Sequence, residues 1–230
     1  MTDFVDDDPL LGRVRKLLAM AEDPACTPAE AEAFTAKATE LIAKYGVDQA
    51  LLAAADPAAD PVGDRIVTHT PPYARDKAGL LAAVAAPLRC RVVHLTRPGE
   101  SRSHLFGHAA DLERVELLFT SLLVQAAHGI AASPVPPGEH AAAYRRSWLV
   151  GYTQAISGRL WAAEQSAAAI VPGAELVLVD RTDLVERRRD EMYPRLGKLG
   201  PRRLRGGGLA HGYRAGQAAD LGGRSPVSSS

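Results

Sequence analysis

The sequence lacks the short motifs that identify the commonest enzyme classes. It has no Walker-type phosphate loop, no G-x-S-x-G elbow, no H-E-x-x-H and no G-x-G-x-x-G after a strand pattern. An active site assembled from distant residues would leave no such motif, so these absences lower the expectation of an enzyme without excluding one. Aromatic residues make up only 5% of the chain, and asparagine does not occur.

Cysteine, net charge and long apolar runs are also scarce. Cys26 and Cys90 are the only cysteines and form no C-x-x-C pair, which is typical of reduced thiols in a cytoplasmic protein. The acidic N-terminus lacks the basic and apolar regions of a signal peptide, and no apolar run approaches 18 residues. The formal net charge is zero. We therefore expect a cytoplasmic protein that does not span a membrane.

The N-terminal stretch carries the clearest helical pattern. Residues 27–30 (Thr-Pro-Ala-Glu) read as a capping box with proline at the first helical position. Apolar residues recur at helical spacing on both sides of this turn: Leu10, Val14, Leu17, Leu18 and Ala21 before it, and Phe34, Ala38, Leu41, Ile42 and Tyr45 after it. Gly46 stands where the left-handed residue of a Schellman stop belongs. The pattern predicts an antiparallel helical hairpin over residues 9–55, with its second helix interrupted at Gly46.

This hairpin resembles a known family. The stretch RVRKLLAMAEDPACTPAEAEAFTAKATELIAKYGVD (residues 13–48) is similar to the N-terminal module of the bacterial and phage family called domain of unknown function 2786. The segments HLFGHAADLERVELLFTSLL and YRRSWLVGYTQAISGRL resemble the region that often accompanies this module. The resemblance implies an architecture and a bacterial or phage context. It implies no catalytic residue, because the family has no assigned activity.

The rest of the chain mixes strand and helix patterns after a linker at 56–64. Strands are expected at 65–70, 90–96 and 101–106, helices at 76–88, from 111, at 141–170 and at 183–193, and a short strand or extended connector at 175–180. Residues 65–193 are thus predicted to form one α+β domain. Residues 194–230 are rich in glycine, arginine and serine and predict a partly disordered tail, in which 209–221 could form a helix.

The long helix expected at 141–170 carries two further patterns. Tyr144, Trp148 and Tyr152 repeat every four residues, which favours a core stripe over a platform for stacking nucleobases. Small residues also repeat along it at Gly151, Ala155, Gly158 and Ala162, and they predict a groove that a second helix can approach closely.

Basic residues gather on the hairpin and near the C-terminus. From residue 181 onward, 11 lysines and arginines stand against 5 acidic residues. Such groups bind phosphates by releasing counterions, and they suggest a non-enzymatic module that binds nucleic acid or an acidic protein. The candidate contact residues are Arg13, Arg15, Lys16, Lys37, Arg187, Arg188, Arg202, Arg203 and Arg205. The alternative is a set of solvated charges with no ligand.

A cluster of histidines offers a different interpretation, a metal-dependent hydrolase or nuclease. The residues are His94, His104, His108 and Asp111, whose side chains suit zinc or another divalent metal. Strand side chains alternate, so His94 and His104 could point to the same face of a hairpin. The structural alternative makes the histidines strand or turn residues and Asp111 a helix cap.

Together these patterns predict a mostly helical α+β protein. An N-terminal helical hairpin is joined to a small antiparallel sheet packed against long helices. The expected working surface is its basic side chains, with no cofactor required.

Overall fold

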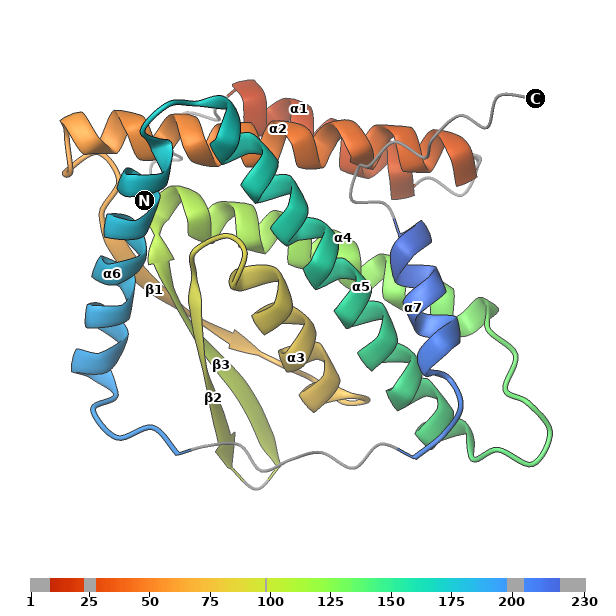
Figure 1. The fold of residues 1–230 in the computed structure, drawn as a ribbon. Coiled ribbons are helices and arrows are strands. Elements are labelled where there is room, and N and C mark those ends of the chain that lie inside the picture. The colour runs from red at the N-terminus through yellow and green to blue at the C-terminus, as the bar shows by residue number, and fades with distance from the viewer. Residues whose placement is uncertain (1–8, 23–27, 98, 198–204, 220–230) are drawn as a thin grey trace, which may run out of the picture.

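The computed structural model describes residues 9–22, 28–97, 99–197 and 205–219. The helices are α1 (Pro9–Glu22), α2 (Pro28–Ala55), α3 (Ala74–Ala85), α4 (Ala109–Ala132), α5 (Ala141–Ile170), α6 (Ala174–Met192) and α7 (Leu209–Ala218). The strands are β1 (Val62–Thr68), β2 (Arg91–Arg97) and β3 (Glu100–His108). The protein is mostly helical α+β, as the sequence predicts (Figure 1).

The three strands form one antiparallel sheet in the order β1-β3-β2. Because strand side chains alternate, the sheet has two distinct faces. Leu105 on one face belongs to the main core cluster with residues of α3 and α4. Phe106 on the other face packs with Val93 and with Val185 of α6. The sheet is therefore covered by α3 and α4 on one side and by α6 on the other (Figure 1).

The N-terminal hairpin packs onto the rest of the molecule. Val14 and Leu18 of α1 and Ala38 and Ile42 of α2 are buried in the same cluster as residues of α3, α4 and α5. The apolar stripes predicted from the sequence thus face the common core. The proposed cap at residue 27 lies outside the described residues.

Gly46 does not stop the second helix, which runs without a break from Pro28 to Ala55. A Cβ built on Gly46 would lie 2.1 Å from Nη1 of Arg114, a side chain of α4 with no exposed surface. Glycine is therefore required here by the close approach of a buried guanidinium group. The glycine that resembles a helix stop is there to make room for Arg114, and the expected interruption of the helix is wrong.

Other boundaries also differ from the sequence expectation. Residues 175–180 form the first turns of α6, because Ala174 and Leu178 lie four residues apart and are buried against Val47 and Ala50 of α2. The first strand begins at Val62, inside the expected linker. Asp111 lies within the first turn of α4 and does not cap it.

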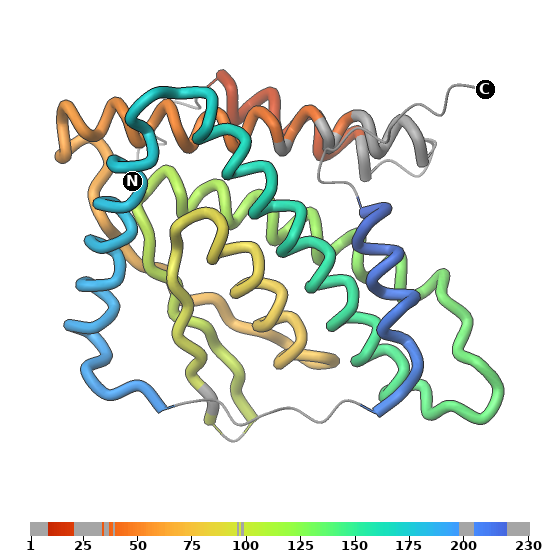
Figure 2. The backbone as a smooth tube through the Cα atoms, in the orientation of Figure 1, coloured from red at the N-terminus to blue at the C-terminus, as the bar shows by residue number. Residues whose placement is uncertain are grey.

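The long helix α5 buries its aromatic stripe and the first half of its small-residue groove. Tyr144, Trp148 and Tyr152 are each no more than 2% exposed, and the rings of Trp148 and Tyr152 stack 5.3 Å apart. The predicted groove holds α7, which runs beside α5 in Figures 1 and 2. A Cβ on Gly212 would lie 1.8 Å from the carbonyl oxygen of Trp148, so the two backbones nearly touch. The aromatic stripe is core, and α7 approaches α5 closely at Gly151 and Ala155, whereas Gly158 and Ala162 of the predicted groove are exposed.

One described helix, α4, is long and apolar enough to cross a membrane by length and composition. In this fold its apolar residues Leu112, Val115 and Leu118 are buried in the core. The core helix of a folded domain meets the same criterion as a membrane span.

Candidate functional site

The basic residues expected to contact a partner do not form one surface. Arg13 and Lys16 are exposed on α1, whereas Arg187 and Arg188 are exposed on α6, at a different edge of the molecule (Figure 1). Arg205 is exposed just before α7. Arg202 and Arg203 lie outside the described residues.

Several of these basic side chains are held by acids. The pairs are Arg15–Glu113 at 2.8 Å, Lys37–Glu40 at 2.9 Å and Arg188–Asp64 at 3.8 Å. Each acid partly cancels the field of its basic partner, so these residues attract a distant anion less than their count suggests.

The histidine and aspartate residues considered for a metal site do not converge. The register of β2 and β3 places Ser103 opposite His94 and Val93 opposite His104. His94 and His104 therefore lie on opposite faces of the sheet, and the expectation of a shared face is wrong. Within the described ranges, no group of three or more His, Cys, Asp and Glu residues is placed to hold a metal ion.

Two members of that set have structural partners instead. His104 bonds to the Asp64 carboxylate through Nε2 and to the Tyr193 hydroxyl through Nδ1, each at 2.8 Å. Nδ1 of His108 donates to the backbone carbonyl of Asp60 at 2.7 Å. The carboxylate of Asp60 also accepts from the amide of Ala110, and so caps α4 from the segment before β1.

A different pair of histidines meets at one serine hydroxyl. Nε2 of His69 lies 2.8 Å from Oγ of Ser103, and Nδ1 of His94 lies 3.3 Å from the same oxygen. The register explains this meeting, because Val67 and His94 are both partners of Ser103 and His69 lies two residues beyond Val67 on the same side of β1. The amide of His69 continues the ladder by donating to the carbonyl of Ser101 at 2.8 Å.

Both imidazoles line a cavity of about 680 Å³, here called the histidine pocket. Its other lining residues are Pro71, Ala74, Arg75, Ala78, Gly79, Arg97, Gly99, Glu100 and Ser101. Arg75 and Arg97 are exposed and place positive charge at the rim. The first turn of α3 also lies against the pocket, and a helix N-terminus carries partial positive charge.

Burial, helped by the charges around the pocket, keeps its histidines neutral. Burial, together with nearby His94 and Lys77, lowers the pKa of His69 from 6.5 to about 4. Burial and the guanidinium of Arg75 lower the pKa of His94 in the same way. Neutral imidazole has one N–H donor and one bare nitrogen that accepts.

Acidic groups near the pocket are few and partly neutralised. Glu100 lines it but pairs with Arg102. Asp76 is buried in the first turn of α3 and does not line the cavity. The lining therefore presents more positive than negative charge to a ligand.

Local sequence patterns do not single out His69, Arg75 and Arg97. The first and last of them are 28 residues apart, and no spacing rule connects the three. The pairing of β1 and β2 with β3, and the packing of α3 against the sheet, bring them together. The available signal was weak: a histidine at the end of a strand pattern, just before two prolines.

Six charged side chains form a buried network inside the molecule. Three arginines, Arg89, Arg114 and Arg181, alternate with three acids, Asp60, Asp111 and Glu164. None of the six is more than 8% exposed. They come from α4, α5, α6 and two connecting segments, so the network fixes these elements relative to one another.

Asp111 is the centre of this network. Its carboxylate accepts from Arg114 at 2.7 Å, from Arg181 at 3.2 Å and from Arg89 at 3.4 Å. Burial alone would raise the pKa of Asp111, but the surrounding guanidinium groups lower it below its ordinary value. The carboxylate is therefore ionised, and each arginine has an acid partner.

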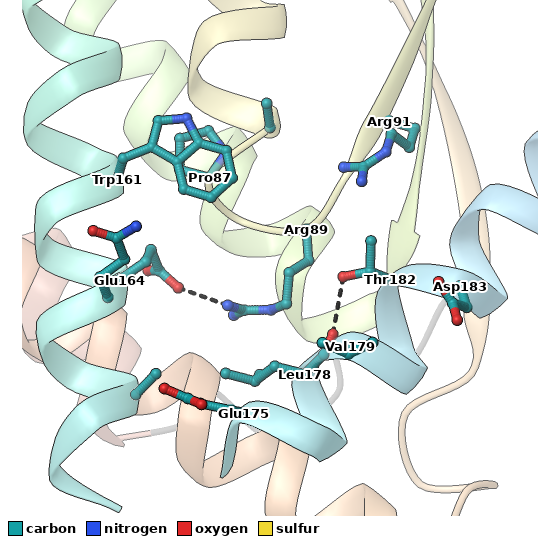
Figure 3. A pocket seen from close by; sticks show the side chains of 13 residues that line it. Pro87, Arg89, Arg91, Trp161, Glu164, Glu175, Leu178, Val179, Thr182 and Asp183 are labelled. Atoms are coloured by element: carbon teal, nitrogen blue, oxygen red, sulfur yellow. Dashed lines mark hydrogen bonds and ion pairs between the residues drawn. The ribbon is translucent and has the colours of Figure 1, made fainter.

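A second cavity, of about 450 Å³, opens over one end of the network (Figure 3). Arg89 and Glu164 face each other at 2.9 Å (Figure 3), and Trp161 and Pro87 also line the cavity. Glu175 and Asp183 are exposed at its rim. Because the arginine is already paired and the rim is acidic, this cavity is poorly suited to an anion.

Comparison with known proteins identifies only the N-terminal module. Residues 10–49 match the family described as protein of unknown function (DUF2786), which confirms the resemblance seen in the hairpin. No curated protein and no solved structure matches the chain. The match includes α1 and most of α2, and it ends before the sheet that forms the histidine pocket.

Proposed function

We propose that this protein is a binding module for phosphate-bearing molecules, and that the histidine pocket holds the phosphate group. Guanidinium groups, imidazole N–H groups and helix N-termini are the groups that proteins use to bind phosphate. The pocket combines all three in a cavity of about 680 Å³, within the usual range for small-molecule sites.

The observation that carries this proposal is the shared serine. Ser103 fixes the two imidazoles side by side at 2.8 and 3.3 Å from its hydroxyl, beneath a rim that carries Arg75 and Arg97. Fixed donors bind better than mobile ones, because less conformational entropy is lost when the ligand enters. The exposed arginines add attraction at a distance.

A nucleotide or a nucleic-acid strand would supply such a phosphate. On a strand, exposed basic residues outside the pocket, such as Arg13 and Lys16 on α1, would add a contribution that falls as salt rises. Arg13 and Lys16 on α1 are separated from Arg187 and Arg188 on α6, so these residues do not form one binding surface. This separation favours the pocket as the principal site. Binding of nucleic acid or an acidic protein through the basic surface alone has less support.

The direct test is calorimetric titration of the full chain with inorganic phosphate at pH 7. Arg75→Gln and Arg97→Gln each remove a charged donor from the rim, and each should weaken binding by about tenfold. Arg13→Gln is the matched control, because it removes an exposed arginine far from the pocket and should change nothing. Absence of phosphate binding to the wild type, or equal binding by all four proteins, would contradict the proposal.

A further inference from the structure

The hydroxyl of Ser103 couples the two histidines of the pocket. Ser103 is completely buried, and within the described part of the chain its Oγ bonds only to Nε2 of His69 and Nδ1 of His94. A hydroxyl group carries a single proton. It therefore donates to one imidazole and accepts an N–H from the other, since the alternatives leave a buried polar hydrogen or lone pair without a partner.

This coupling fixes what the pocket presents to a ligand. If Ser103 donates to His69, the proton of His69 is on Nδ1, while His94 donates from Nδ1 and its Nε2 is bare. If Ser103 donates to His94, both assignments reverse. In either arrangement one of the outer nitrogens, Nδ1 of His69 or Nε2 of His94, is a donor and the other is an acceptor.

The outer nitrogens are available for a ligand. Neither has a hydrogen-bond partner in the described ranges, and both rings line the cavity. The burial of the rings and the neighbouring Arg75 and Lys77 disfavour a second proton on either imidazole. The pattern of one donor and one acceptor therefore persists at neutral pH.

We infer that the histidine pocket selects phosphate groups that keep a P–OH, meaning inorganic phosphate and the singly ionised form of a phosphate monoester, over sulfate and phosphodiesters. The P–OH donates to the bare nitrogen, an unprotonated phosphate oxygen accepts from the other imidazole, and the rim arginines meet the remaining charge. Sulfate has the same shape but no proton at pH 7, so its oxygen would face a bare nitrogen. A phosphodiester fails for the same reason.

This inference rests on the proposed function and narrows it. The ligand would be free phosphate, or a nucleotide monophosphate or phosphorylated strand end whose phosphate still carries one proton, and the internal linkages of a nucleic acid would not enter. Discrimination arises from one unpaired polar contact in a partly buried site, which corresponds to about tenfold in affinity or more.

The test compares sodium phosphate with sodium sulfate at pH 7 and constant ionic strength, by calorimetry on the full chain. The wild type should bind phosphate at least about tenfold more tightly than sulfate. Ser103→Ala frees each imidazole to place its proton on the outer nitrogen, so sulfate binding should improve and the ratio should fall toward one. Ser121→Ala, which removes a buried hydroxyl that meets Gln125 on α4, is the control and should keep the wild-type ratio.

A second measurement needs no variant and covers the case in which Ser103→Ala does not fold. Repeating the wild-type titrations between pH 7 and pH 5 changes the protonation of the imidazoles without a substitution. The ratio of phosphate affinity to sulfate affinity should fall as the pH falls, because a protonated imidazole is a donor at both nitrogens and can then serve sulfate.

The outcomes separate the two proposals. If neither anion binds, the proposed function is wrong. If both bind equally at pH 7, or if their affinity ratio does not change between pH 7 and pH 5, the pocket binds anions but the inferred selectivity is wrong. A ratio that survives in folded Ser103→Ala would also overturn the inference, since the coupling through the serine would not be its cause.

Discussion

Replacing Gly46 with alanine should destabilise the protein, against the usual trend for helices. Alanine in the interior of a helix is ordinarily about 1 kcal/mol better than glycine. Here the added Cβ would lie 2.1 Å from Nη1 and 2.3 Å from Cζ of Arg114, far inside normal contact distance. That guanidinium is fully buried and bonded to Asp111 at 2.7 Å and to Glu164, so it has no free space to move into.

The expected change in the free energy of unfolding follows from these two opposing effects. Breaking a buried ion pair costs about 3–5 kcal/mol, so Gly46→Ala should lower the free energy of unfolding by about 2–4 kcal/mol after the helix gain is subtracted. Urea denaturation followed by circular dichroism measures this change. Gly158→Ala in α5 is the matched control, because an added Cβ there meets nothing within 4 Å. It should be neutral or stabilising by up to about 1 kcal/mol.

A double-mutant cycle then tests the cause. When Arg114 is already replaced by alanine, Gly46→Ala should no longer destabilise, so the two changes should be coupled by at least about 2 kcal/mol. A Gly46→Ala protein that is as stable as Gly158→Ala would refute the reasoning.

Four further outcomes are expected. The free energy of unfolding should fall as the pH decreases from 6.5 toward 4, because the lowered pKa of His69 means that the unfolded chain binds more protons in that window. The loss is at most about 3 kcal/mol and is reduced by water in the cavity. Urea titrations at each pH should show a smaller loss in His69→Gln. Asp60→Asn should destabilise by about 3 kcal/mol in urea, since Arg181 loses its 2.6 Å partner in a buried site. Gly212→Ala should release α7 from α5, seen as faster hydrogen exchange in α7 and a loss of about 1–3 kcal/mol, because the new Cβ meets the Trp148 carbonyl. Arg15→Ala, by contrast, should cost less than about 1 kcal/mol, because the Arg15–Glu113 pair is part-exposed; a larger loss would show that this pair is more than a surface contact.

Local patterns were sufficient to predict much of the fold. The apolar stripes of the hairpin, the aromatic stripe of α5 and the first half of the small-residue groove each report which face of a helix is buried, and the structure buries those faces. The prediction failed where a residue serves a distant partner. Gly46 resembles a helix stop, but it accommodates Arg114 from another helix.

The segment 175–180 failed for a related reason. Its alternating valines and leucines favour a strand. The segment is helical because Leu178 packs against α2, a contact that local sequence does not reveal. Asp111 resembles a helix cap, yet it is the centre of the buried network. In each case tertiary packing overrides a local preference.

The candidate site was less predictable than the fold. His94 was identified from the sequence, but its partners His69 and Ser103 come from β1 and β3, and the register of the sheet decides which side chains meet. Shifting either strand by one residue would send these side chains to the other face. The charge network was equally hard to predict, because its six members are spread from residue 60 to residue 181.

The most direct test of the central claim is imidazole NMR of the ¹⁵N-labelled full chain during titration with inorganic phosphate at pH 7. The chain has seven histidines, and the signals of His69 and His94 can be assigned by His69→Asn and His94→Asn. The expected result is that these two signals shift together and saturate while the other five remain in place. If phosphate moves neither signal, or moves those of His128 and His140 instead, the histidine pocket is not where this protein binds phosphate.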